Sequence, residues 1–167
     1  MERERLEARQ APCWSDAEAA EQALLKLHAE WPFDMIYERY SLWSDAGVKA
    51  AELLGVPLIL EVNAPLLVEQ EQYRRLALHA KAQAIERHVF TQADGIICVS
   101  SAVRLYAIKQ GAPSGRTMVL GNAVDTARFH STVPPMPLGL PEDAFVIGFN
   151  GSLKRWHGVD VMMEAFR

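Results

Sequence analysis

The stretch PLILEV, residues 57–62, decides the fold class of this chain. It follows a glycine at position 55 and is too uniformly apolar for a strand with one solvated face. A second apolar run, GIICV, covers residues 95–99. Continuous apolar strands are typical of a parallel sheet that is covered on both faces. The two runs therefore predict a buried parallel sheet.

Helical patterns separate these strands. Apolar periodicity and capping signals predict helices over 16–30, 44–54, 66–88, and from Ser100 or Ser101 to just before Gly111. Strands are predicted over 34–39, 57–62, 95–99, 117–120 and 145–149. The apolar face of the long helix is expected to consist of Leu66, Tyr73, Leu76, Ala80 and Ala84. Alternating strands and helices indicate right-handed βαβ units, and hence an α/β fold with helices on both faces of a doubly wound sheet.

Composition narrows the functional classes. The net charge of −4 and the pI of about 5.7 argue against a nucleic-acid-binding protein. Two cysteines, Cys13 and Cys98, fit no metal-binding spacing and favour a reduced, cytoplasmic setting. The chain has neither a signal-peptide core nor an apolar stretch of the roughly 20 residues that span a bilayer. Peripheral membrane contact stays open.

A proline-rich stretch divides the chain. We expect residues 1–130 to form one domain, 131–143 to form a linker, and 144–167 to begin a second domain. The second part is expected to hold a strand over 145–149 and a helix from Gly158. One strand and one helix cannot bury their apolar faces alone, so their packing and self-association through an exposed sheet edge stay open.

The chemistry is expected at the carboxyl ends of the strands, where open α/β sheets bind ligands. No dinucleotide, P-loop, zinc-protease or nucleophile-elbow motif is present in the sequence. Gly151 is followed by Lys154 and Arg155 at the start of a helix, a combination that suits a phosphate or pyrophosphate without a metal. An ordinary solvated loop explains these residues equally well.

Two other strand ends carry polar residues. Glu61 and Asn63 follow the second strand, and Arg39 and Tyr40 end the first, so these side chains are expected to line one cleft. The alternatives are that Asn63 caps the turn before a proline and that Arg39 forms an ion pair.

After the fourth strand, Asn122 and Asp125 are expected to form a hinge or a domain-boundary turn. We prefer this structural role to a part in ligand binding.

In their order and spacing, several segments resemble the retaining glycosyltransferases of family 4, which have the GT-B fold. The segments are residues 93–100, 111, 122–125, 129, 146–154, 157–158 and 164–166. The resemblance extends over about residues 33–167. It implies two Rossmann-like domains, of which the N-terminal one binds the acceptor and the C-terminal one binds a nucleotide-diphosphate sugar.

The resemblance also implies roles for individual residues. Gly151, Ser152, Lys154 and His157 would contact the donor phosphates, with no cofactor and no metal. Ser152 stands where the family commonly has Arg, and His157 where it commonly has Lys. On the acceptor side, Asn63 stands in place of a histidine. The acceptor would be a carbohydrate, a lipid-linked molecule or a small molecule.

By the same resemblance, residues 1–130 lack the first strand of their domain, and the catalytic carboxylates are expected beyond Arg167. The predicted function is transfer of a sugar to a hydroxyl acceptor with retention, and residues 1–167 alone are expected to be inactive. The alternative is a non-catalytic Rossmann-like module that binds a ligand or a partner. The donor sugar, the nucleotide base and the acceptor stay open.

Overall fold

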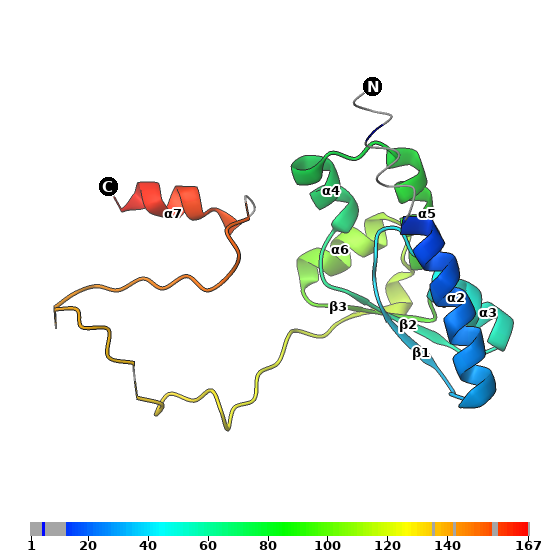
Figure 1. Cartoon of the computed structure of the whole chain (residues 1–167), viewed down its shortest axis with the longest axis horizontal. Coiled ribbons are helices and arrows are strands. Elements are labelled where there is room, and N and C mark those ends of the chain that lie inside the picture. The colour runs from blue at the N-terminus through cyan, green and yellow to red at the C-terminus, as the bar shows by residue number, and fades with distance from the viewer. Residues whose placement is uncertain (1–4, 6–12, 135, 142, 155–156, 167) are drawn as a thin grey trace. The chain divides into compact units, whose positions relative to one another are not determined.

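The computed structural model describes residues 5, 13–134, 136–141, 143–154 and 157–166. Contacts between residues divide the chain into two compact units, Met1–Asn122 and Ala123–Arg167. The first unit is a sheet with helices packed around it (Figure 1). No helix in the described part of the chain has the length and apolar character needed to cross a membrane.

The first unit is built on a four-stranded sheet with the order β1-β2-β3-β4. The strands are β1 (Ile36–Arg39), β2 (Leu58–Val62), β3 (Gly95–Cys98) and β4 (Thr117–Val119). Each neighbouring pair is parallel, and helices occupy the connections between the strands. This arrangement confirms the predicted α/β class with a Rossmann-like parallel sheet.

Two of the connecting helices have the ends that the sequence predicts. α3 (Ala46–Leu54) connects β1 to β2 and stops at Gly55, whose φ of 67° is a left-handed conformation that glycine adopts without strain. α6 (Ser101–Lys109) connects β3 to β4. The side chain of Ser100 caps it by accepting a hydrogen bond from the amide of Val103.

The connection between β2 and β3 holds two helices, α4 (Leu66–Arg74) and α5 (His79–Gln92). The prediction of one helix over 66–88 is wrong, because the chain leaves the helical conformation at Arg75, where φ is 59°. The predicted apolar face is only partly present, since Leu66 and Leu76 pack against the core whereas Tyr73, Ala80 and Ala84 are exposed. The buried residues of the two helices are Leu67, Ala82, Glu86, Val89 and Phe90. After the break at Arg75, α5 places a different set of residues in the core from the set that a continuous helix over 66–88 predicts.

The sheet buries one face more completely than the other. The buried face carries Ile36, Leu58, Leu60, Val62, Ile96 and Cys98. α2 (Cys13–Glu30) packs beside α3 (Figure 1). Leu24 of α2 packs against this core. On the other face, Tyr37 and Met118 are 55% and 56% exposed. The apolar runs predict burial on both faces, and the described residues bury the second face only in part.

The core encloses the carboxylate of Glu86, which lies on α5 and is fully buried. Glu86 accepts hydrogen bonds from the hydroxyl groups of Tyr40 at 2.6 Å and Tyr106 at 2.7 Å. Tyr40 follows β1 and Tyr106 lies on α6, so Glu86 links three elements of the fold. The prediction that Tyr40 faces a ligand cleft is wrong, because its side chain enters the core.

In the second unit, α7 (Val159–Ala165) begins after Gly158, as the sequence predicts. Residues 145–149 have no regular secondary structure, so the predicted strand is not formed, and Phe145 is 85% exposed. A strand needs a neighbouring strand to pair its amide and carbonyl groups, and the described residues of this unit contain none. The assignment of residues 144–167 to a donor domain stays a prediction.

Gly47 on α3 is expected to tolerate no larger residue. A Cβ atom at this position would overlap Oε2 of Glu38 and would lie 3.3 Å from Cδ1 of Leu58. We expect Gly47→Ala to lower the free energy of unfolding by about 1–3 kcal/mol, since overpacking forces neighbouring side chains to move. Chemical denaturation measures the loss. Gly115→Ala is the matched control, because a Cβ there meets no atom within 4 Å. Equal losses in the two variants would contradict the prediction.

Glu86 should make the stability of the fold depend on pH. Burial raises the pKa of Glu86, although the hydroxyl groups of Tyr40 and Tyr106 oppose the shift. In the unfolded chain the group ionises near its ordinary pKa of about 4.3. Protonated Glu86 therefore favours the folded state below that pH, and this contribution is lost as the pH rises through the raised pKa.

The measurement compares the unfolding free energies of the wild type and Glu86→Gln at a series of pH values. The unfolding free energy of the wild type minus that of the variant should fall from about pH 4 upward and level off above the pKa of Glu86 in the folded state. A difference that does not change with pH would contradict this expectation.

Candidate functional site

The carboxylate of Glu61, on β2, lies among three side chains that donate to it. The hydroxyl group of Tyr37 donates a 2.6 Å hydrogen bond to Oε2, and Nδ2 of Asn63 donates a 2.7 Å hydrogen bond to Oε1. Nε of Arg39 forms an ion pair with Oε1 at 3.5 Å. These four residues are referred to below as the Glu61 cluster.

The register of the sheet brings the Glu61 cluster together. Arg39 on β1 pairs with Glu61 on β2. Side chains alternate along a strand, so Tyr37 and Arg39 project from the same face. Asn63 follows Glu61 by two residues and reaches the same carboxylate from the end of its own strand. The cluster therefore lies at the carboxyl ends of β1 and β2, where parallel sheets bind ligands.

The cluster keeps Glu61 ionised. The hydrogen bond from Tyr37 lowers the pKa of Glu61 most, and Asn63 and Arg39 contribute in the same direction. The same hydrogen bond raises the pKa of Tyr37, because the phenol loses its favourable contact when it ionises. The result is a charged hydrogen-bond acceptor held in a fixed orientation.

Beyond these contacts, the cluster has an accessible donor in Arg39 and a buried acceptor atom in Asn63. The side chain of Arg39 is 74% exposed, so its remaining N–H groups are accessible to an anion or to an oxygen acceptor. Oδ1 of Asn63 is buried and has no hydrogen-bond partner among the described residues. Together with Glu61, the cluster offers both acceptors and donors to a polar ligand that carries hydroxyl groups.

The structure brings together the three residues that the sequence predicts for one cleft, Arg39, Glu61 and Asn63. The alternative for Arg39, an ion pair, is also present, because its partner is Glu61 itself. Tyr37 was not predicted to be part of this group. Strand alternation was the available signal, since a residue two positions before Arg39 on the same strand projects from the same face. The part that these residues play in binding stays a prediction.

The residues predicted to hold donor phosphates lie in the second unit, in the loop before α7. Nδ1 of His157 donates a hydrogen bond to the carbonyl group of Ser152, and the His157 ring lies 5.8 Å from the ring of Phe149 between centroids. A Cβ at Gly151 would lie 3.0 Å from the Phe149 ring. Lys154 is exposed, and its amide donates to the carbonyl group of Ser152. The loop therefore closes around one carbonyl group and presents Lys154 to solvent.

Asn122 and Asp125, the predicted hinge, lie on either side of the division between the units. Oδ1 of Asp125 accepts a 2.9 Å hydrogen bond from the amide of Ala127, which makes a turn of the kind that aspartate favours. A hinge at this place stays a prediction. Arg155, expected to add charge to the phosphate loop, lies outside the described residues.

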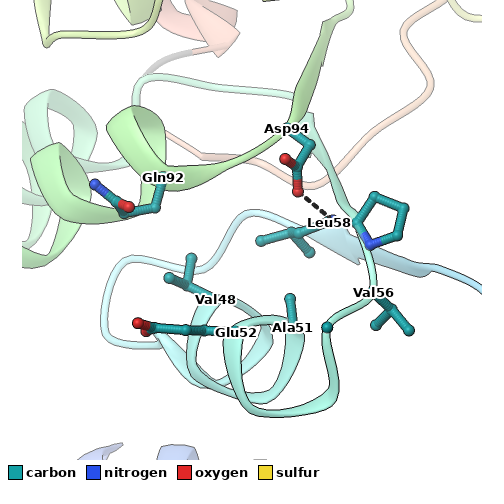
Figure 2. A pocket seen from close by; sticks show the side chains of 9 residues that line it. Val48, Ala51, Glu52, Val56, Leu58, Gln92 and Asp94 are labelled. Carbon is teal, nitrogen blue, oxygen red and sulfur yellow. Dashed lines mark hydrogen bonds between the residues drawn. The ribbon is translucent and has the colours of Figure 1, made fainter.

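A cavity of about 470 Å³ lies at the amino ends of β2 and β3, away from the Glu61 cluster. Figure 2 shows Asp94 directed to Leu58, whose amide donates a 2.9 Å hydrogen bond to its carboxylate. The Asp94 carboxylate is therefore engaged in holding the start of β2. Parallel sheets bind ligands at the carboxyl ends of their strands, and this cavity lies at the opposite end. Within the described residues, no group of three or more His, Cys, Asp or Glu side chains is placed to hold a metal ion.

A family model and two curated relatives that match this chain are all glycosyltransferases. The family model of Glycosyltransferase Family 4 matches residues 9–128. D-inositol 3-phosphate glycosyltransferase 2 of Catenulispora acidiphila is 29% identical over 154 residues, which cover 83% of this chain and 34% of the relative. D-inositol 3-phosphate glycosyltransferase 1 of the same organism is 29% identical over 146 residues, which cover 83% of this chain and 35% of the relative. The chain thus spans about a third of the length of the curated relatives it matches.

Tyr37 is expected to set the ionisation of Glu61. Tyr37→Phe removes the hydrogen bond that lowers the pKa of Glu61 most, so that pKa should rise toward its ordinary value of about 4.3. Carboxyl ¹³C NMR titration of Glu61 measures the change. Tyr73→Phe is the matched control, because it removes a phenol on α4 that is not among the groups that contact Glu61. A Glu61 pKa that stays the same in Tyr37→Phe would contradict the prediction.

Proposed function

The chain belongs to glycosyltransferase family 4, and on this premise we propose that the protein transfers a sugar from a nucleotide-diphosphate donor to a hydroxyl acceptor, with retention of the anomeric configuration. The match to residues 9–128 carries the proposal, because it includes all four strands of the sheet and the Glu61 cluster. A GT-B arrangement of two Rossmann-like domains is part of the same proposal.

The Glu61 cluster is the proposed acceptor side. The charged carboxylate of Glu61 accepts hydrogen bonds from acceptor hydroxyl groups, and Arg39 donates to an oxygen or an anionic group of the same molecule. The matched relatives are named for D-inositol 3-phosphate, a polyol phosphate whose hydroxyl and phosphate groups are complementary to these two side chains. A hydroxyl-rich acceptor, free or as part of a carbohydrate or lipid-linked molecule, is therefore the proposed class.

The loop of Gly151, Ser152, Lys154 and His157 is the proposed donor side. The positive charge of the exposed Lys154 side chain is suited to stabilise the charge that develops on a departing nucleoside diphosphate. No metal ion is required in this proposal. The catalytic carboxylates are proposed to lie outside residues 1–167, so these residues alone would not transfer sugar. The length of the matched relatives, about three times that of the chain, supports this part of the proposal.

The test is a transfer assay on the protein expressed from the complete gene. The assay offers uridine, guanosine and adenosine diphosphate sugars together with polyol and sugar acceptors. Proton NMR of the product identifies the anomer. Transfer with retention supports the proposal, and inversion contradicts its mechanism. Absence of both transfer and nucleotide binding would favour the non-catalytic binding module.

Lys154 is expected to contribute to donor affinity. Lys154→Ala should raise the Kd for the nucleoside diphosphate by about tenfold or more, since a hydrogen bond to a charged group is worth about 1.5–3 kcal/mol. Calorimetric titration measures the Kd. Lys26→Ala, which removes an exposed lysine on α2, is the matched control. Equal affinities of Lys154→Ala and the wild type would contradict the proposed donor loop.

A further inference from the structure

Tyr40 connects the Glu61 cluster to the interior of the first unit. It directly follows Arg39, the last residue of β1, and its amide donates a 2.8 Å hydrogen bond to the carbonyl group of Glu61. Its side chain is only 5% exposed, and its hydroxyl group donates a 2.6 Å hydrogen bond to Oε2 of Glu86. One residue therefore joins the backbone of Glu61 to a buried carboxylate on α5.

The other contacts of Glu86 fix its position. The hydroxyl group of Tyr106, on α6, lies 2.7 Å from each of the two carboxylate oxygens. The ring of Phe90 packs against both phenols, with centroid distances of 5.0 Å to Tyr40 and 6.4 Å to Tyr106. A carboxylate held in this way offers the Tyr40 hydroxyl group a single, well-defined position.

Stability alone is a weak explanation for a carboxylate at this place. Burial of a charged group is unfavourable, and a well-packed apolar residue of similar volume is often as stabilising or more so. The hydrogen bond to Glu86 fixes the direction of the Tyr40 side chain, which an apolar residue in place of Glu86 cannot do. The direction of this side chain affects the end of β1, because Tyr40 follows Arg39 and its amide is hydrogen-bonded to the carbonyl group of Glu61.

We propose that Glu86 is a positioning residue for the acceptor side of the protein. Acting through Tyr40, it holds the end of β1 so that Tyr37 and Arg39 stay within reach of the Glu61 carboxylate. The inference rests on the proposed function only where it assigns the Glu61 cluster to the acceptor. A purely structural network would behave differently, since its loss would lower stability and leave the Glu61 cluster unchanged in the folded protein.

The pKa of Glu61, measured by carboxyl ¹³C NMR, distinguishes the two roles. In Tyr40→Phe the link to Glu86 is lost, and the pKa of Glu61 should rise by roughly half a pH unit as its donors loosen. Exchange of the Tyr40 amide hydrogen should also become faster relative to the core amides. Val103→Ala is the matched control, because it removes buried apolar volume on α6 and none of the hydrogen-bonding groups of the network. Its Glu61 pKa should equal that of the wild type.

A second pair of variants tests Glu86 directly. Glu86→Gln keeps an oxygen that can accept from Tyr40, so the pKa of Glu61 should stay close to the wild-type value. Glu86→Leu removes both acceptors and should shift that pKa upward as Tyr40→Phe does. Should Glu86→Leu fail to fold, Tyr40→Phe and Val103→Ala still decide the question.

Two results would overturn the proposal: a wild-type Glu61 pKa in Tyr40→Phe, or an equal shift in Val103→Ala. The titrations use neither sugar donor nor acceptor. A negative result would therefore remove the positioning role and leave the proposed transferase function to its own assay.

Discussion

The parallel register of β1 on β2 is the constraint on which both the core and the candidate site depend. Ile36 pairs with Leu58, and Arg39 pairs with Glu61. A slip of one residue would exchange the two faces of β1, because side chains alternate along a strand. It would turn the Arg39 charge into the core and expose Ile36. The cost of burying that charge protects the register and, with it, the geometry around Glu61.

The interior of the first unit is not purely apolar, and its carboxylates lie close to the strand that carries the candidate site. Glu38 lies on β1 between Tyr37 and Arg39 but projects from the opposite face, against Gly47. Burial raises the pKa of Glu38, while the amide of Gly47 and the hydroxyl group of Ser44 oppose the shift. The two faces of β1 differ, because the contact between Glu38 and the Ser44 hydroxyl group is 3.5 Å long, whereas the hydrogen bond from Tyr37 to Glu61 is 2.6 Å. The hydrogen bond of Tyr37 restricts the strand more sharply than apolar packing does, because short hydrogen bonds are directional.

The sequence predicts the four strands of the first unit well and the contacts between distant residues poorly. The apolar runs at 57–62 and 95–99 correspond to β2 and β3 because strand formation there follows from local composition. The break at Arg75 depends on how α4 and α5 each meet the core, which periodicity over 66–88 does not contain. The direction of Tyr40 depends on Glu86, a residue 46 positions away. Arg39, Glu61 and Asn63 were within reach of prediction because parallel strands end at one edge of a sheet.

The two proposed halves of the active site differ in how far they are organised. Glu61 is held by three donors on a paired strand, whereas Lys154 is an exposed side chain in a loop. In bulk water a pair of unit charges 4 Å apart gains only about 1 kcal/mol, and the gain is about 4 kcal/mol where the effective dielectric constant is near 20. An exposed lysine alone therefore stabilises a departing diphosphate weakly. For Lys154 to contribute to the transition state, water must be excluded around it when the donor binds. The donor loop must therefore lose water around Lys154 for the proposed chemistry. The hydrogen bonds of the Glu61 cluster, in contrast, exist before any ligand arrives.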